Sequence, residues 1–429
     1  MATSPLRNAA HPSSWSAAAK VEVVCTACDA VMPKKLTIFV HRASEYLTDH
    51  ESHGEGLICY SLLRGLADRG HQIFAYTNRA ALRESVPGLR VREHIHRIPA
   101  NSLAPWEHAW YAQRWLKELS QDQTIDLVWH MNPSGGGGCP YPPHTSGKPL
   151  VIGPMYYDWP EQPGVRPTTG RPRLGVGLQG LVGPLMERGW HRTLRAASLI
   201  FCATEPHTAV IQAQYPQAVV KTLPVIVTPP DGLGTASRRG PEPGGPVTLL
   251  FVANLVPYKN PDVFIEMVAL LRQGGVDAQG IILGDGPERE RLQAQCTRLD
   301  MGRAICFVGK VPNAEVYRHV SEADFLISLS QGEPYGRGIA EAMSVGTPTV
   351  CHRSGGPADF INDGKDSLLV EELTAEAYAR RIQTALRTPG TWSRLSANSM
   401  HKAEDWHNEV VLSRLEKDLF TLVQEGKKH

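Results

Sequence analysis

The sequence lacks an excess of charge of either sign. Its 429 residues contain 44 Lys and Arg against 43 Asp and Glu, a formal net charge of +1. No global field therefore attracts nucleic acid, and any basic site must be local. The chain also lacks an uninterrupted apolar run that approaches the roughly 18 residues of a membrane-spanning helix, so we expect no such helix.

The cysteines lack the spacing of a metal site. Cys25 and Cys28 form one CxxC pair, but no second pair and no pair of histidines at metal spacing follows it. Several of the others lie within apolar runs, which is typical of reduced thiols in the cytosol. We therefore predict no metal ligands and a cytoplasmic protein. The remaining six are Cys59, Cys139, Cys202, Cys296, Cys306 and Cys351.

The chain start lacks the basic residues and apolar stretch of a secretory signal peptide, so residues 1–33, rich in Ala and Ser, are predicted to be a disordered tail.

Beyond them, apolar runs typical of buried strands alternate with helical patterns, and no short repeat appears. This alternation predicts an α/β fold with mostly parallel sheets and right-handed crossovers. Pro and Gly cluster between the two halves. The predicted divisions are a first domain at 34–228, a linker at 229–246, a second domain at 247–400 and a final helix within 401–429.

The most informative stretch is residues 332–343, Gly-Glu-Pro-Tyr-Gly-Arg-Gly-Ile-Ala-Glu-Ala-Met. It follows the strand-like run 324–329 and is predicted to turn tightly into a helix, whose N–H groups and dipole suit an anion. Glu333 and Glu341 are eight residues apart, a rise of about 12 Å on a straight helix. That is too far for a glycosidase pair, which needs at most about 9.5 Å. The spacing suits a long ligand gripped at both ends, with a diphosphate between them.

This stretch resembles the Glu-x7-Glu signature of the retaining glycosyltransferases of family 4. The resemblance implies the GT-B fold, in which two Rossmann-like doubly wound domains face a cleft and the last helix crosses back to the first domain. It also implies metal-independent transfer of a hexose-type sugar from a nucleotide diphosphate sugar, UDP-linked before GDP-linked, to an acceptor hydroxyl. In such enzymes Glu341 would hold the ribose hydroxyls and Glu333 the transferred sugar.

Residues 251–261 resemble the family loop in which an arginine and a lysine neutralise the donor diphosphate. Lys259 matches the lysine, whereas Asn254 stands in place of the arginine. Either the missing charge is supplied elsewhere, for example by Arg337, or the donor binds weakly. The resemblance implies further donor contacts from backbone N–H groups and from the segment around the nucleobase: Gly336, Gly338, Val308, Gly309 and Lys310.

The first half resembles the family more loosely. Gly54 and Gly56 are similar to the glycines of its first loop, which let a substrate approach the backbone. His130 ends a strand-like run, and ligands of doubly wound sheets bind beyond such strand ends. His130 is therefore a candidate for contact with the donor sugar or the acceptor. For Gly54, Gly56 and His130 alike, the alternative is a purely structural role.

Two surface features of the first half leave their roles open. Arginines between Arg166 and Arg195 suit an anionic acceptor or a solvated basic face. Trp106, Trp110 and Trp115 on one predicted helix favour core packing over an acceptor site or contact with a membrane surface.

Other functions are also open. A sugar-nucleotide epimerase or an inverting transferase on the same fold would need an acid or base, for which His130 is the visible candidate. A non-catalytic nucleotide-sugar binder is favoured by the neutral Asn254. The predicted partners are a nucleotide-sugar donor and a saccharide, lipid-linked or small-metabolite acceptor, without a separate cofactor. Peripheral membrane contact through the first domain is a further hypothesis.

Overall fold

The computed structural model describes residues 35–50, 54–94, 104–131, 145, 147–155, 188–230, 232–233 and 240–425. Several predictions fall outside these residues: the disordered tail at 1–33, the pair Cys25 and Cys28, and the arginines from Arg166 to Arg173.

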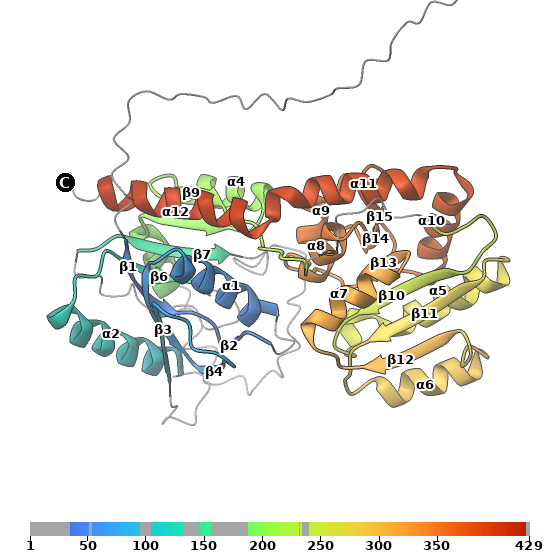
Figure 1. The fold of residues 1–429 in the computed structure, drawn as a ribbon, viewed down its shortest axis with the longest axis horizontal. Helices are drawn as coiled ribbons and strands as arrows, with labels where there is room; N and C mark the ends of the chain where they lie inside the picture. The colour runs from blue at the N-terminus through green and yellow to red at the C-terminus, as the bar shows by residue number, and fades with distance from the viewer. Residues whose placement is uncertain are drawn as a thin grey trace, which may run out of the picture. The chain divides into compact units, whose positions relative to one another are not determined.

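A seven-stranded parallel sheet forms the first half of the described chain, in the order β5-β3-β1-β6-β7-β8-β9 (Figure 1). Helices cover both faces of such sheets, so its central strands are apolar on both sides. In β1, Phe39 and Val40 point to opposite faces and both are fully buried, in separate hydrophobic clusters. The strands are β1 (Thr37–Arg42), β3 (Gln72–Thr77), β5 (Leu89–Glu93), β6 (Leu127–His130), β7 (Leu150–Met155), β8 (Leu199–Cys202) and β9 (Val219–Thr222).

The two glycines compared with a loop of the family lie in a helix. Gly54 and Gly56 belong to the first turn of α1 (Gly54–Asp68) and not to a loop, so the loop prediction is wrong for both. Glu55 in that turn interacts favourably with the helix dipole. The other described elements of this half are α2 (Ala104–Asp122), a helix at 188–196, α4 (Glu205–Gln214) and the small parallel sheet of β2 (Tyr46–Thr48) and β4 (Arg79–Ala81).

The tryptophans of α2 have different environments. Trp115 is 8% exposed and packs against Phe39 and Phe74, which confirms the prediction of core packing for this residue. Trp110 is 53% exposed, so that prediction is wrong for this residue.

A six-stranded parallel sheet forms the second half, in the order β12-β11-β10-β13-β14-β15. The order reverses between β10 and β13, and ligands of open α/β sheets bind at such a switch point. The two sheets confirm the predicted α/β fold with parallel sheets in two domains. The strands are β10 (Val247–Val252), β11 (Ala278–Leu283), β12 (Ile305–Gly309), β13 (Phe325–Ser328), β14 (Thr349–His352) and β15 (Leu368–Val370). The helices are α5 (Pro261–Gln273), α6 (Arg289–Arg298), α7 (Asn313–Glu322), α8 (Arg337–Ser344), α9 (Gly356–Phe360) and α10 (Ala375–Arg387).

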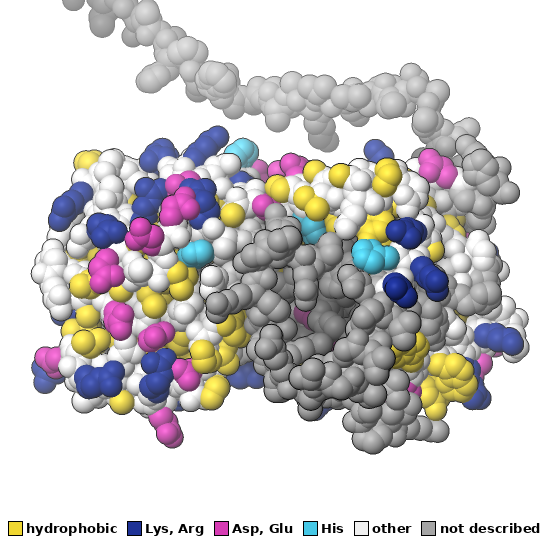
Figure 2. Space-filling model, turned by 180° about the vertical axis from the view of Figure 1, so that it is seen from behind, with side chains coloured by type: hydrophobic (Ala, Val, Ile, Leu, Met, Phe, Trp, Pro, Cys, Tyr) yellow, Lys and Arg dark blue, Asp and Glu magenta, His cyan; other side chains and the backbone are white. Residues whose placement is uncertain are grey.

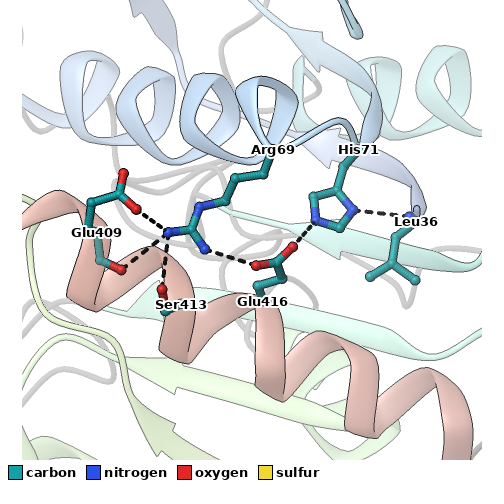
Figure 3. Close-up of polar contacts among 6 residues, drawn as sticks. All are labelled: Leu36, Arg69, His71, Glu409, Ser413 and Glu416. Carbon is teal, nitrogen blue, oxygen red and sulfur yellow. Dashed lines mark hydrogen bonds and ion pairs between the residues drawn. The ribbon is translucent and has the colours of Figure 1, made fainter. Parts of the chain in front are cut away.

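The C-terminal segment contains two helices, and the second of them, α12 (Asn408–Glu425), lies within the predicted final helix at 401–429. α11 (Thr391–Ala403) is followed by a short 3-10 turn at Glu404–Trp406 and by α12. α12 packs along α1, and Figure 3 shows the polar contacts of that packing. Arg69 bonds Glu409 and Glu416 at 2.6 and 2.9 Å. His71 accepts the Leu36 N–H at Nδ1, so its Nε2–H donates to Glu416 at 2.9 Å.

The surface carries both signs of charge close together. On the left of Figure 2, Lys and Arg side chains lie among Asp and Glu side chains, as the near-zero net charge leads one to expect. In the described part of the chain, no helix combines the length and the apolar composition needed to cross a membrane. Peripheral membrane contact stays a prediction.

Candidate active site

Glu333 lies on a loop and not on a helix. The helix predicted within residues 332–343 begins only at Arg337, because Gly336 has a left-handed φ of 91° and caps α8 outside helical geometry. The rise of about 12 Å along a straight helix therefore does not describe the two glutamates. Glu333 belongs to the loop after β13, and Glu341 lies in the second turn of α8.

The loop of Glu333 is held by the Gly-rich turn that follows β14. The Glu333 carbonyl accepts the Gly356 N–H at 2.9 Å, and the Gly332 N–H donates to Ser354 Oγ at 3.0 Å. Gly355 has φ +61°, and a Cβ added there would lie 2.3 Å from the Glu333 carbonyl oxygen. Only glycine fits this close approach.

Lys259 pairs with Glu333. It ends a short 3-10 turn (Pro257–Lys259) after β10, and its Nζ lies 2.6 Å from Oε2 of Glu333. The two side chains are only 19% and 20% exposed. Asn260 supports this arrangement, because its side-chain amide donates to the Leu329 carbonyl at 2.8 Å. Two contacts thus join the loops after β10 and β13: the Lys259–Glu333 ion pair and the hydrogen bond from Asn260 to the Leu329 carbonyl.

Arg337 pairs with Glu341 one turn along α8. The Arg337 Nε and Glu341 Oε1 lie 2.9 Å apart, as an ion pair without hydrogen-bond alignment. The Glu341 side chain is 6% exposed and that of Arg337 is 18% exposed. Tyr317 of α7 is close to this pair: burial raises the pKa of its phenol, the Glu341 carboxylate raises it further, and Arg337 opposes the rise.

These groups line one cavity of about 350 Å³ at the switch point of the second sheet. Gly284, which follows β11, and residues of α7 and α1 complete its walls. Sequence reasoning missed Tyr258, Ser330 and Asn313. Asn313 follows the end of β12 and starts a helix, which is a recognisable position for a ligand contact. The predicted residues that line the cavity are Glu333, Lys259, Glu341, Gly336, Arg337, Gly338, Asn254, Lys310 and Gly54.

Four predicted site residues do not line this cavity: His130, Gly56, Val308 and Gly309. Gly56 is buried within α1, and Val308 lies on β12 with 39% of its surface exposed. Gly309 instead supports the wall, because its carbonyl accepts the Gly284 N–H at 2.8 Å.

His130 is part of a buried histidine group in the first domain. It ends β6, is 1% exposed, and its Nδ1 lies 3.3 Å from Nδ1 of His41. Burial lowers the pKa of His130 well below its usual value, and the neighbouring His41 and Arg42 lower it further. His130 is therefore neutral at pH 7. In the part of the chain described, no cluster of His, Cys, Asp and Glu side chains could hold a metal ion.

The second half matches a known family. Residues 235–402 match the model described as "Glycosyl transferases group 1". Among curated relatives, 2-deoxystreptamine glucosyltransferase of Streptomyces kanamyceticus is 29% identical over 216 residues, which cover 48% of this chain and 56% of the relative. Lipopolysaccharide core biosynthesis glycosyltransferase LpsE of Rhizobium meliloti (strain 1021) is 31% identical over 154 residues, or 36% of this chain and 44% of the relative. The matches span about half the length of these relatives.

Solved structures agree in fold over most of the chain. Sucrose-phosphate synthase from Thermosynechococcus elongatus aligns with a TM-score of 0.65 and 17% identity, covering 90% of this chain and all of that one. WaaG, a glycosyltransferase involved in lipopolysaccharide biosynthesis, aligns with a TM-score of 0.63 and 18% identity, covering 90% of this chain and 99% of that one. At these identities the likeness concerns the fold alone, which is that of GT-B glycosyltransferases.

Proposed function

We propose that this protein is a retaining glycosyltransferase that moves a hexose-type sugar from a nucleotide diphosphate sugar to an acceptor hydroxyl. The observation that carries the proposal is the pair of ion pairs in one cavity, Lys259 with Glu333 and Arg337 with Glu341. A ligand that enters must satisfy two carboxylates and their cations together. A nucleotide sugar does so, because hydroxyl groups flank its diphosphate on both sides.

Each half of the cavity has its own task in this proposal. Glu341, on α8, accepts hydrogen bonds from the ribose hydroxyls. Glu333, on the loop, accepts them from the transferred sugar. The diphosphate is bound by Lys259, which lies beside Glu333, and by the first N–H groups of α8, which carry the positive end of the helix dipole. We propose UDP-sugars as donors before GDP-sugars.

The chemistry follows from where charge develops. The bond from the anomeric carbon to the diphosphate oxygen breaks, and a bond to the acceptor oxygen forms on the same face of the sugar. The acceptor proton passes to an oxygen of the leaving diphosphate. Lys259 stabilises the negative charge on that leaving group, a contribution of about 3–4 kcal/mol for a well-placed donor. The proposed reaction needs no metal ion, because fixed positive groups already meet the diphosphate.

The names of similar proteins support the proposed sugar donor and the proposed acceptor. One relative is named as a GDP-mannose-dependent alpha-mannosyltransferase, and one similar structure was solved in complex with UDP-glucose. Others are named for 2-deoxystreptamine and for D-inositol 3-phosphate. We therefore propose a small polyhydroxylated acceptor as the first to test, with saccharide and lipid-linked acceptors after it.

A panel of UDP-, GDP- and ADP-sugars tests the proposal, with EDTA present and without added metal. Binding is measured by calorimetry, and release of the nucleotide by chromatography, with and without acceptors. We expect saturable binding of one donor and its loss in Glu341→Ala and Lys259→Ala. Glu376→Ala and Lys417→Ala are matched controls, because both residues are exposed and lie outside the cavity.

Two results would contradict the proposal. Absence of donor binding at millimolar concentration removes the nucleotide-sugar site. Product with inverted anomeric configuration, read by NMR, leaves a glycosyltransferase but removes the retaining mechanism.

A further inference from the structure

A row of aromatic rings stands behind the loop of Glu333. Tyr335, two residues after Glu333, is 4% exposed and is not among the described residues that line the cavity. The ring centroids of Tyr335 and Phe360 lie 5.2 Å apart. Those of Phe360 and Trp406 also lie 5.2 Å apart, in an edge-to-face arrangement. Such distances are typical of attractive aromatic pairs, and we call these three residues the aromatic row.

The far end of the aromatic row lies where the two halves of the structure are connected. Trp406 ends the 3-10 turn between α11, which packs against α8, and α12, which packs against α1. Its carbonyl accepts the Val227 N–H at 3.0 Å. Val227 belongs to the buried segment that follows β9 and leaves the first sheet. Two segments that connect the halves therefore meet at Trp406.

The segment after β9 also holds Tyr335. Burial raises the pKa of the Tyr335 phenol, and a hydrogen bond from the backbone of Val225 opposes the rise. Val225 is two residues from Val227 and is 2% exposed. Tyr335 is thus held at its ring by Phe360 and at its hydroxyl by Val225. In a close-packed interior, a side chain held at both ends leaves the loop that carries it little freedom to move.

α9 connects the aromatic row to the backbone of Glu333. Phe360 is the last residue of this helix, and Gly356, its first residue, donates its N–H to the Glu333 carbonyl at 2.9 Å. Asp359 of the same helix accepts the Thr204 hydroxyl at 2.6 Å. The helix is therefore fixed from both sheets, and loss of the ring at its end would let the loop of Glu333 shift.

We propose that Tyr335 is a positioning residue for Glu333, and that Phe360 and Trp406 act through it. The proposal rests on the proposed function, because it assumes that Glu333 holds the transferred sugar. In the described part of the chain, none of the three rings lines the cavity, so their effect passes through the backbone of the loop. The turn that ends at Trp406 thereby becomes part of the support of the active site.

The kinetics of single variants test this role. A displacement of about 1 Å at a reacting group can cost about 10²-fold in rate. We expect Trp406→Leu and Phe360→Leu to lower kcat at least tenfold and to leave the affinity for UDP, measured by calorimetry, within threefold of wild type. UDP lacks the sugar that Glu333 holds, so only a general disturbance of the site would weaken UDP equally. Should wild type prefer GDP, GDP replaces UDP.

Two further variants keep the test decisive. Tyr335→Phe retains the ring and loses only the bond to Val225, so we expect its kcat to fall less than threefold. Phe360 is only partly buried, so Phe360→Leu folds even if the loss of the Trp406 ring prevents folding. Thermal unfolding shows which variants are folded.

Trp392→Leu is the matched control. Trp392 of α11 is 6% exposed, as Trp406 is, but it packs in the other hydrophobic cluster of the second domain. We expect a loss of stability in urea comparable with that of Trp406→Leu, together with a kcat within threefold of wild type.

The reactivity of Lys259 reports on the loop without any donor. Its Nζ pairs with Glu333, so displacement of the loop leaves the amine more reactive. Competitive labelling with acetic anhydride is read by mass spectrometry. We expect Lys259 to be labelled at least threefold faster in Phe360→Leu than in wild type, and at an unchanged rate in Trp392→Leu.

Three results would overturn the inference. Unchanged kcat and unchanged labelling of Lys259 in Phe360→Leu would show that the aromatic row does not hold the loop. An equal loss of kcat in Trp392→Leu would mean that stability alone is responsible. A loss of UDP affinity as large as the loss of kcat would mean that the whole site is disturbed. Failure of wild type to bind any nucleotide instead contradicts the proposed function, and the labelling result still decides whether the row holds the loop.

Discussion

Lys259 and Glu333 are 74 residues apart in the sequence, yet the Lys259 Nζ lies 2.6 Å from Glu333 Oε2. They come from the loops after β10 and β13, the two strands between which the strand order of the second sheet reverses. The sheet topology therefore creates the pair, and the pair marks the place where a ligand meets both loops.

We predict that Lys259→Ala lowers kcat/KM about 10²- to 10³-fold with the donor found in the panel, because one preorganised donor to the leaving group is lost. Both side chains are partly exposed, so the free energy of unfolding should change by less than about 1 kcal/mol. Initial rates and urea unfolding check both statements. Activity within threefold of wild type would remove Lys259 from the reaction.

We predict that stability falls below pH 6.5 because of the buried histidines. Burial, and then Arg42, lowers the pKa of His41 from 6.5 to about 3, and burial also lowers the pKa values of His108 and His130. As pH falls below 6.5, the unfolded chain takes up protons that the folded protein does not bind. The stability that these groups contribute is complete above pH 6.5 and is lost progressively toward the folded pKa, at about 1.4 kcal/mol per pH unit for each histidine.

Urea unfolding between pH 7.5 and 5 measures this slope before most carboxylates titrate. The double variant His41→Asn, His130→Asn should flatten it, whereas His401→Gln, at an 84% exposed position, should leave it unchanged. A wild-type slope near zero would show that the buried histidines do not control stability in this range.

We predict that Glu416 contributes more than Glu409 to the docking of α12. Glu416→Ala leaves the buried His71 Nε2–H without its acceptor and weakens the hold on Arg69, at a cost of about 1–3 kcal/mol. Glu409 also pairs with Arg69 but is 71% exposed, so Glu409→Ala should cost less than about 1 kcal/mol. Urea unfolding compares the two, and equal losses would contradict the ranking.

We predict that Gly355→Ala displaces the loop of Glu333. The added Cβ meets the Glu333 carbonyl oxygen, and the backbone has φ +61° and ψ −149°, where an L-residue is strained. We expect a loss of about 1–3 kcal/mol in stability together with a loss of activity. The control is Gly390→Ala, which has φ +74° but no atom within 4 Å of the new Cβ. It should cost about 1–2 kcal/mol and leave the activity of the folded protein intact. Equal activity in both variants would show that the Gly355 turn does not position Glu333.

Strands with a continuous apolar run could be predicted from the sequence, whereas an edge strand of mixed composition in the first sheet could not. The sequence of β10 (Val247–Val252) predicts a strand, because a mostly apolar run of this length is typical of a strand buried on both faces. β9 (Val219–Thr222) was not predicted, since this edge strand is only partly buried and has a mixed composition. The helix starts at Gly54 and Arg337 cannot be located from the sequence, because glycines in or beside the first turn conceal the boundary.

The sequence by itself determined the α/β class and the residues most worth examining, because apolar runs, Gly and Pro act through local geometry and a motif is a matter of spacing. Only the tertiary structure decided which of those residues meet. It brought Lys259 to Glu333, paired Arg337 with Glu341, and placed His130 against His41 in a buried group outside the cavity. Some of these contacts join segments far apart in the chain, and others depend on the direction that burial gives a side chain. Local sequence patterns predict neither the long-range contacts nor the side-chain directions.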